Sequence, residues 1–427
     1  MKFIDLYAGL GGFHLALEEL GHECVFASEV NTILRELYTK NFPGTKILGD
    51  ILKVNIENEI PKHQILCGGF PCQPFSRAGL QRGFNDEKKG NHFFRIMEIL
   101  DQHKPEFILL ENVETILKHD KSQTFEIIEN LLKVRYDIQH KVLSPHEFNI
   151  PHHRRRLFIV GRKIELGGLK GFKWPERKDL DNTSISSIEF KTIENENLEI
   201  PKKQLKAYEI WNEFVKNFPE PKDLPGFPIW SHEWGATYEY DNRTPFSTPT
   251  EELIKMKGTF GNPISGVSKE EILKNEIPRY AAYEEQKFPK WKINFIRRNR
   301  ELYDKHKTYF DEFKRKLIEL EFSYQKFEWS CGSESNKLDD KLIQFRQSGV
   351  RVSKSNWAPA LTTIKTQNIY LPWLKRKMSL HEKAQLQSMH RLKYLPDPEN
   401  GAHKAFGNAV NVEVVKLIAK NLLNGNE

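Results

Sequence analysis

The first 165 residues alternate short apolar runs with amphipathic stretches, and this pattern limits the possible folds more than any other feature. The apolar runs are expected to form strands, at residues 3–8, 24–28, 47–48, 64–67, 107–110 and 157–161. The amphipathic stretches are expected to form helices, at 13–20, 32–41, 92–103 and 122–134. Apolar strands that alternate with helices predict an α/β fold with a doubly wound, mostly parallel sheet. Such sheets bind ligands at the carboxyl ends of their strands.

The sequence changes character near residue 166. A chain of 427 residues is too long for one core. We expect a first domain at 1–165, a second, irregular domain at 166–370, and a C-terminal segment, 371–427, that returns to the first domain. Residues 280–326 are dense in charged and aromatic side chains and predict a helical insertion in the second domain, and residues 408–423 predict one further helix.

Charge and cysteine content narrow the classes of protein. Residues 1–150 hold 17 Lys and Arg against 21 Asp and Glu, whereas residues 151–427 hold 48 against 37. The excess positive charge therefore lies in the second part, as in an enzyme that binds a polyanion, although a solvated basic surface fits equally well. Four cysteines without CxxC spacing predict neither a disulfide framework nor a metal site. With no membrane span or signal peptide apparent, we expect a cytoplasmic protein.

A glycine-rich turn after the first strand suggests a nucleoside-type ligand. The segment 5–13 reads DLYAGLGGF, so a strand leads through glycines into a helix, where backbone can approach a ligand closely. It is not the dinucleotide fingerprint, because His14 stands where the third glycine belongs. Glu29 follows the second strand and could bind ribose hydroxyls, and Asp50 follows the third and could contact an adenine amino group. Each alone could be an ordinary strand-end acid.

Three further strand ends carry groups that suit catalysis. Cys72 stands between two prolines in the segment 68–76, GGFPCQPFS, where a rigid turn would present the thiol to a substrate. Glu111 ends a wholly apolar strand, where burial would raise the pKa of its carboxyl group. His152, Arg154 and Arg156 alternate before the strand at 157–161, so they would point to one face and could clamp an anion or a carbonyl oxygen. A packing cysteine, a helix cap and a solvated basic turn are the competing interpretations.

Together these motifs resemble those of the DNA (cytosine-5-)-methyltransferase family over residues 1–165 and about 345–424. The resemblance implies that Cys72 adds to C6 of cytosine, that Glu111 contacts N3 and the exocyclic amine, and that Arg154 and Arg156 hold the base and neighbouring phosphates together with His152. It also implies an S-adenosyl-L-methionine site in a catalytic and cofactor-binding domain. The residues implied for that site are Tyr7, Gly9, Leu10, Gly11, Gly12, Glu29, Asp50, Ile51 and Asn408. Asn408 belongs to the segment 406–410, FGNAV, whose helix would pack back and close the cofactor pocket.

The second domain would then be the target-recognition domain, and the partner double-stranded DNA. Arg346 and Arg351 are expected to contact DNA, and the stretch 230–243 is a further place for groove contacts. The loop after Cys72 would close over DNA, with Ser76, Arg77 and Arg82 among its contacts. His152 replaces a usual glutamine, and His92 stands where a leucine is usual.

Three statements about biology follow from the resemblance. The protein would be a monomer that flips its target base, and would act as the modification enzyme of a restriction-modification system, with a cognate endonuclease but no stable complex with it.

A transfer-RNA cytosine-5 methyltransferase shares the catalytic motifs, but it has a short middle region and a Cys-Phe-Thr element that is absent here. A non-catalytic DNA-binding regulator on the same fold would have lost Cys72 or Glu111, and both are present.

Overall fold

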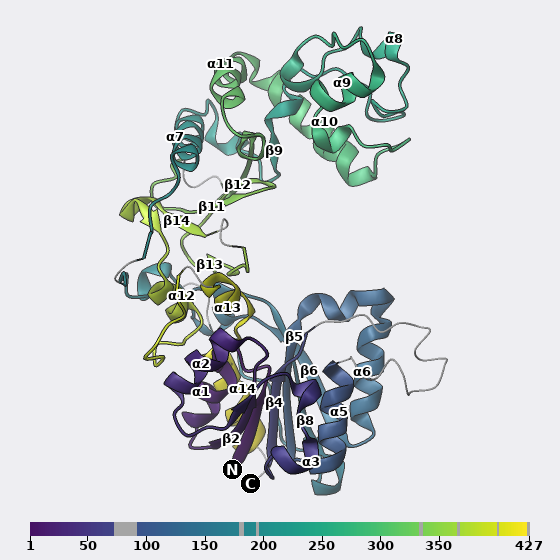
Figure 1. The fold of residues 1–427 in the computed structure, drawn as a ribbon. Coiled ribbons are helices and arrows are strands. Elements are labelled where there is room, and N and C mark those ends of the chain that lie inside the picture. The colour runs from purple at the N-terminus through teal and green to yellow at the C-terminus, as the bar shows by residue number, and fades with distance from the viewer. Residues whose placement is uncertain are drawn as a thin grey trace. The chain divides into compact units, whose positions relative to one another are not determined.

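The computed structural model describes residues 1–71, 92–178, 183–193, 196–332, 336–364, 368–398 and 401–424. The chain divides into two compact units (Figure 1). Unit 1 comprises residues 1–196, 356–365 and 379–427, and unit 2 comprises residues 197–355 and 366–378. The change of sequence texture was placed near residue 166, thirty residues before this boundary. The segment after it stays with unit 1 because it is bonded there: the Leu169 amide donates to Asp137, and the Lys178 amide donates to the Glu147 carbonyl.

Unit 1 is built on a seven-stranded sheet of order β3-β2-β1-β4-β5-β8-β6 among the described residues. Strands β1 to β5 run parallel, whereas β8 is antiparallel to both of its neighbours. The doubly wound, mostly parallel sheet predicted from the sequence is therefore confirmed. The sheet strands are β1 (Lys2–Leu6), β2 (Glu23–Ser28), β3 (Ile47–Leu48), β4 (Ile65–Gly69), β5 (Phe107–Val113), β6 (Tyr136–Leu143) and β8 (Arg156–Lys163), and β7 (His152–His153) pairs with β13 (Ala358–Pro359).

Helices cover both faces of this sheet. In Figure 1, α1, α2 and α14 lie on one face, and α3, α5 and α6 lie on the other. The α2 helix begins where sequence predicts, because the Asn31 side chain accepts a hydrogen bond from the Leu34 amide and caps it. The helices of unit 1 are α1 (Gly12–Glu18), α2 (Thr32–Asn41), α3 (Ile56–Glu59), α5 (His92–His103), α6 (Gln123–Lys133), α12 (Leu380–Leu386), α13 (Ala402–Asn408) and α14 (Val412–Asn424).

Two expectations for unit 1 were wrong in detail. Strand β6 was not predicted from the sequence, because it is the edge strand of the sheet and alternates buried with exposed side chains instead of being apolar throughout. The helix expected at 408–423 is α14, which begins four residues later, at Val412, and the helix that ends at Asn408, α13, was not predicted from the sequence. Asn411 lies between these two helices, and its side chain accepts a hydrogen bond from the Val414 amide at 3.1 Å.

Unit 2 has a six-stranded sheet of order β15-β14-β11-β12-β10-β9 and two hydrophobic cores among the described residues. The stretch 230–243 supplies much of these cores, since Trp230, Trp234 and Tyr238 are buried. The strands are β9 (Ile229–Trp230), β10 (Lys326–Ser330), β11 (Leu342–Arg346), β12 (Gly349–Ser353), β14 (Ile369–Leu371) and β15 (Arg376–Lys377), and the helices are α7 (Lys202–Lys216), α8 (Thr250–Leu253), α9 (Lys269–Asn275), α10 (Lys290–Lys305) and α11 (Lys307–Ile318).

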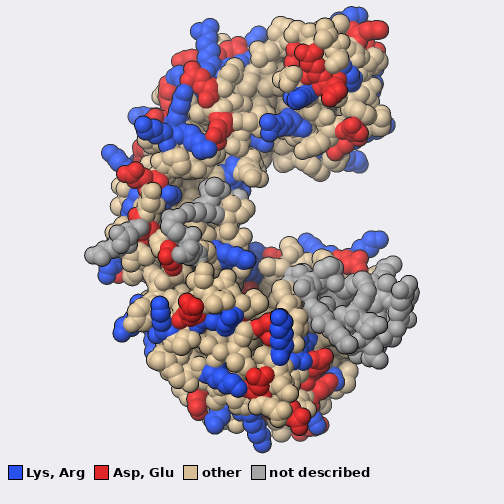
Figure 2. All heavy atoms as spheres, viewed as in Figure 1, with Lys and Arg blue, Asp and Glu red and all other residues tan. Residues whose placement is uncertain are grey.

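Basic and acidic side chains are interspersed on the face of each unit that Figure 2 shows. Many of the cations in unit 2 are paired with acids, as in the contacts Lys305–Asp223 and Lys316–Glu213. Net charge therefore does not by itself identify a binding surface on that face. A binding surface has to be identified from specific side chains. None of the helices that the structure describes is long and apolar enough to cross a membrane.

Candidate active site

A cavity of about 690 Å³ opens in unit 1 at the carboxyl ends of the parallel strands. Parallel strands place these ends at one edge of the sheet, which is where doubly wound folds bind ligands. The turns that follow β1 to β5 form most of its wall. The start of α5, the segment that leads into β8, and α13 with the turn after it complete the wall. Of the residues expected at the cofactor site and the reacting base, the cavity is lined by Tyr7, Gly9, Gly12, Glu29, Asp50, Ile51, Glu111, Arg154, Arg156 and Asn408.

The glycine-rich turn shapes the β1 side of the cavity. Gly9 has a φ of +55°, a left-handed conformation that glycine adopts without strain. A Cβ atom on Gly12 would come within 2.5 Å of Val410 Cγ2, so the α1 terminus can approach the α13–α14 turn only without a side chain there. Leu10 and Gly11, also expected at the cofactor site, do not line the cavity. Leu10 is buried in the core, and a Cβ on Gly11 would strike the Phe42 ring.

Glu29 is held rigidly at the end of β2. One carboxylate oxygen accepts the Gly9 amide at 3.0 Å, and the other accepts the Asn31 amide at 2.8 Å. These two bonds fix the carboxylate plane and leave its remaining lone pairs for a ligand in the cavity. Asp50 has a second function in the fold, because its side chain accepts the Leu52 amide at 3.1 Å and caps the turn that carries Ile51.

Tyr7 and His92 form a contact at the cavity wall. The Tyr7 hydroxyl donates to the His92 carbonyl at 3.1 Å, and the two rings meet edge to face with centroids 5.3 Å apart. His92, which stands where the family usually has leucine, therefore lines the cavity and positions the tyrosine ring. Burial lowers the pKa of His92, and the nearby Asp50 carboxylate partly offsets this effect.

Glu111 lies at the end of β5 with 6% of its surface exposed. Its Oε1 lies 3.0 Å from Arg156 Nε. Burial raises the pKa of the carboxyl group, and the nearby guanidiniums of Arg156 and Arg154 partly offset this effect. A carboxyl group with a raised pKa can share a proton with a ring nitrogen close to neutral pH.

Arg154 is almost completely buried and is only partly paired. Its Nη2 donates to the Gly407 carbonyl at 2.7 Å, whereas its Nε and Nη1 are buried and have no hydrogen-bond partner in the described part of the chain. Burial lowers the pKa of this guanidinium to about 9, so it still carries its charge at pH 7. An unpaired buried cation in a cavity wall is costly unless a ligand supplies acceptors.

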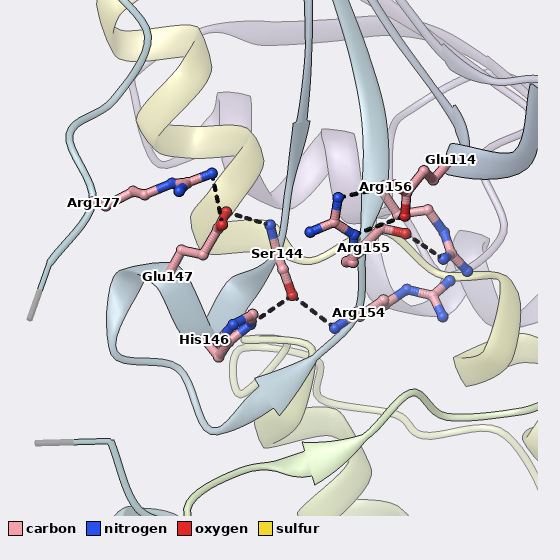
Figure 3. Close-up of polar contacts among 8 residues, drawn as sticks. All are labelled: Glu114, Ser144, His146, Glu147, Arg154, Arg155, Arg156 and Arg177. Carbon is pink, nitrogen blue, oxygen red and sulfur yellow. Dashed lines mark hydrogen bonds and ion pairs between the residues drawn. The ribbon is translucent and has the colours of Figure 1, made fainter. Parts of the chain in front are cut away.

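Local hydrogen bonds fix the direction of these arginines (Figure 3). The Arg154 amide donates to Ser144 Oγ at 2.9 Å, next to a turn closed by Glu147. Arg155 points outward and makes a two-bond ion pair with Glu114. The alternation predicted from the sequence therefore holds, with Arg154 and Arg156 toward the cavity and Arg155 toward solvent.

His152 shares the inward direction but does not reach the cavity. It is fully buried, its Nδ1 lies 3.1 Å from the Leu386 carbonyl, and its Nε2 accepts the Leu361 amide at 3.4 Å. Its pKa is lowered well below the usual value, chiefly by burial. His152 thus links β7 to the C-terminal part of unit 1 and is not in the wall of the cavity.

The other expected site residues are distributed as follows. Cys72, Ser76, Arg77 and Arg82 lie outside the described residues, although Pro71, which precedes Cys72 in the chain, lines the cavity. Arg346 and Arg351 lie on the sheet of unit 2, and both pair with Glu328.

Sequence reasoning also missed several wall residues. Asn112 lines the cavity, and its side-chain amide donates to the Phe70 carbonyl at 3.0 Å, which fixes the β4 end beside β5. Lys404, Ala405 and Val410 line it from the C-terminal segment. The segment 406–410 could have indicated Val410, whereas no sequence signal pointed to Lys404 or Ala405.

Comparison with known proteins identifies relatives along the entire chain. The family model described as C-5 cytosine-specific DNA methylase matches residues 1–424. The Type II methyltransferase M.HhaI of Haemophilus parahaemolyticus is 41% identical over 206 residues, which is 48% of this chain and 62% of that protein. M.DsaV of Dactylococcopsis salina is 46% identical over 162 residues, 38% of this chain and 45% of that protein. The Type II methyltransferase M.AluI of Cellulosimicrobium cellulans is 26% identical across 98% of this chain and 91% of its own length. The first two matches thus span less than two thirds of each relative.

Proposed function

Because the chain belongs to the C-5 cytosine-specific DNA methylase family, we propose that it transfers a methyl group from S-adenosylmethionine to C5 of cytosine in a short sequence of double-stranded DNA. The observation that carries this proposal is a single cavity whose wall has two parts with different side chains. Glu29 and Asp50 lie on one part of it, and Glu111, Arg154 and Arg156 lie on another. A nucleoside donor and a pyrimidine ring could therefore meet inside it.

The donor side of the cavity fits S-adenosylmethionine. Glu29 offers fixed carboxylate oxygens to two ribose hydroxyls, and the missing side chains of Gly9 and Gly12 leave room for the ligand beside the backbone. Asp50 and Ile51 would contact the adenine, and the Tyr7 ring would pack beside it. When bound, S-adenosylmethionine supplies a methyl group activated by a sulfonium centre.

The part of the cavity with Glu111, Arg154 and Arg156, its reacting side, would stabilise the charge that develops on the cytosine ring. C5 of cytosine is a poor nucleophile until a nucleophile adds to C6 and makes the ring electron-rich. Glu111 would hold a proton at N3, which stabilises the negative charge that this addition creates. Arg156 positions Glu111 through the 3.0 Å contact, and the unpaired nitrogens of Arg154 would donate to acceptor oxygens of the base or its phosphate.

Cys72 would be the nucleophile, on the evidence of its place in the sequence directly after Pro71. The thiolate would form a bond to C6, and C5 would form a bond to the methyl carbon as the bond between that carbon and the sulfonium sulfur breaks, its electron pair remaining on sulfur. A base then removes the C5 proton, and the electron pair of that C–H bond restores the ring double bond as the C6–S bond breaks. The target cytosine must leave the duplex stack to reach the cavity, at a cost of a few kcal/mol.

Trapping tests reaction and substrate together. Duplex DNA carrying 5-fluorocytosine at the target should form an adduct with the wild-type protein that survives denaturation, because fluorine at C5 cannot leave as the proton does. Cys72→Ser should form none while it still binds S-adenosylmethionine. Bisulfite mapping of a methylated plasmid would give the target sequence. Methyl transfer without any adduct would refute the mechanism, and transfer to transfer RNA but not to duplex DNA would refute the substrate.

The names of the relatives suggest the biological setting. Type II methyltransferases are the modification partners in restriction-modification systems, and we propose the same role here, with a cognate endonuclease that forms no stable complex with this protein. Protection of a plasmid from a nuclease of matching specificity, after expression of this chain, would test that role.

A further inference from the structure

The sheet of unit 2 has one apolar and one polar face. Phe327, Trp329, Val350 and Val352 point into the core, as alternation along β10 and β12 requires. The intervening side chains lie on the opposite face and are partly exposed, among them Glu328 of β10, Arg351 of β12 and Arg346 of β11. Two of the arginines expected to contact DNA therefore lie on one rigid surface.

Glu328 joins these two arginines. Its Oε2 accepts a hydrogen bond from Arg346 Nη2, and its Oε1 lies 3.3 Å from Arg351 Nε. Glu328 and Arg351 are direct neighbours across the β10–β12 pair, whereas Arg346 belongs to β11, on the far side of β12. One carboxylate thus holds two guanidiniums that would otherwise repel each other.

Gly349 allows β12 to lie close to β10, the strand that carries Glu328. It pairs with Arg346 across β11 and β12 and has a φ of +137°. A Cβ atom on Gly349 would come within 2.8 Å of the Lys326 carbonyl oxygen on β10. A side chain there would collide with the β10 backbone two residues before Glu328, so glycine lets β12 lie close to β10.

Each guanidinium keeps donors for a ligand. Arg346 contacts Glu328 through Nη2, and its Nη1 makes no hydrogen bond to a described residue. Arg351 faces Glu328 through its buried Nε, so its two Nη groups are left for a ligand. A guanidinium with a free edge in a fixed direction matches the O6 and N7 acceptors of guanine. A phosphate fits less well, because the Glu328 carboxylate would repel it.

We propose that Glu328 and Gly349 are positioning residues that aim Arg346 and Arg351 at guanine bases in the target sequence. This inference rests on the proposed function, since it requires a DNA target. Glu328 orients the guanidiniums and lowers the charge of the cluster, and Gly349 permits the contact between strands. Specificity would then depend on two residues that need not touch DNA.

The test uses the full chain and duplexes that contain its mapped target. Each guanine is replaced in turn by 7-deazaguanine, which removes the N7 acceptor and keeps base pairing. For the wild type, replacement at the guanines read by these arginines should lower kcat/KM about tenfold, the effect of one hydrogen bond to a charged donor. In Glu328→Gln the same replacement should cost less than about threefold. In the control Glu312→Gln, which changes an exposed acid on α11, the penalty should match the wild type.

The penalty is the ratio of kcat/KM values for two duplexes measured with the same variant. A smaller folded fraction lowers both values equally and does not change the ratio. Gly349→Ala should also reduce the penalty, because its Cβ would displace the backbone of β10, the strand that carries Glu328. An unchanged penalty in Glu328→Gln would overturn the inference, as would a target in which no guanine replacement matters. Removal of either arginine could instead lower the number of counterions released on DNA binding by about one, while no guanine replacement changes kcat/KM. That result would show phosphate contacts and would also overturn the inference. Failure of the wild type to methylate any duplex would refute the proposed function itself.

Discussion

Replacing Glu29 with glutamine tests the cofactor side of the cavity most directly. The carboxylate accepts two backbone amides, from Gly9 and Asn31, and each of its oxygens keeps a lone pair for the ligand. Glutamine has the same shape but only one acceptor oxygen. Its NH₂ group must face one of the two amides, so a backbone donor loses its acceptor and one ligand hydroxyl loses a charged partner.

The size of the effect follows from those losses. A hydrogen bond to a charged group contributes roughly 1.5–3 kcal/mol, so loss of one ribose contact predicts S-adenosylmethionine binding weaker by about 10- to 150-fold. The unpaired backbone amide should lower the free energy of unfolding by about 1–3 kcal/mol. Calorimetric titration with S-adenosylmethionine measures the first quantity, and urea unfolding measures the second.

Glu36→Gln is the matched control, because Glu36 is an exposed acid on α2 with no ion-pair partner among the described residues. It should bind the cofactor as the wild type does. If Glu29→Gln binds within twofold of the wild type while the control is also normal, Glu29 does not hold the ribose and the assignment of this end of the cavity is wrong.

Three further substitutions have defined outcomes. Glu111→Gln should lower single-turnover methyl transfer by about 10²–10³-fold and leave cofactor affinity within about threefold, because it removes only stabilisation of the transition state. Arg155→Ala should keep activity within about twofold and cost at most about 1 kcal/mol of unfolding free energy, because the Arg155–Glu114 pair is exposed; rapid-quench assays and urea unfolding measure these values. Burial raises the pKa of Asp5 to about 8. Between pH 4 and pH 8 the folded state therefore keeps a proton on Asp5 that the unfolded state has lost. The free energy of unfolding should fall as pH rises through that window. Asp5→Asn should flatten this fall in melting temperature, and an unchanged pH dependence would show that Asp5 does not cause it.

Sequence patterns predicted the elements whose side chains carry a local signal. Residues 32–41 and 92–103 form the helices α2 and α5 with the expected bounds, since their amphipathic period is complete within each segment. The strand at 136–143 was missed because half of its side chains face solvent. The start of α14 was predicted four residues too early because apolar positions continue through the segment between α13 and α14.

In the site, too, the residues placed by local sequence patterns could be predicted, and those placed by contacts distant in the chain could not. Glu29, Asp50 and Glu111 could be placed together from sequence, because parallel strands bring their carboxyl ends to one edge. The position of His152 could not, since its partners Leu361 and Leu386 are more than 200 residues away in the chain. The pairing of Arg346 and Arg351 with Glu328 likewise depends on strand order, which no local pattern fixes.

Arg154 explains why the C-terminal segment belongs to the chemistry and not only to the packing. Its Nη2 bonds to the Gly407 carbonyl, one residue before the Asn408 side of the cavity, and its own position is fixed through Ser144. The same guanidinium faces the reacting side, where its remaining nitrogens have no described partner. A shift of the turn at 407–410 would therefore move a charge beside Glu111.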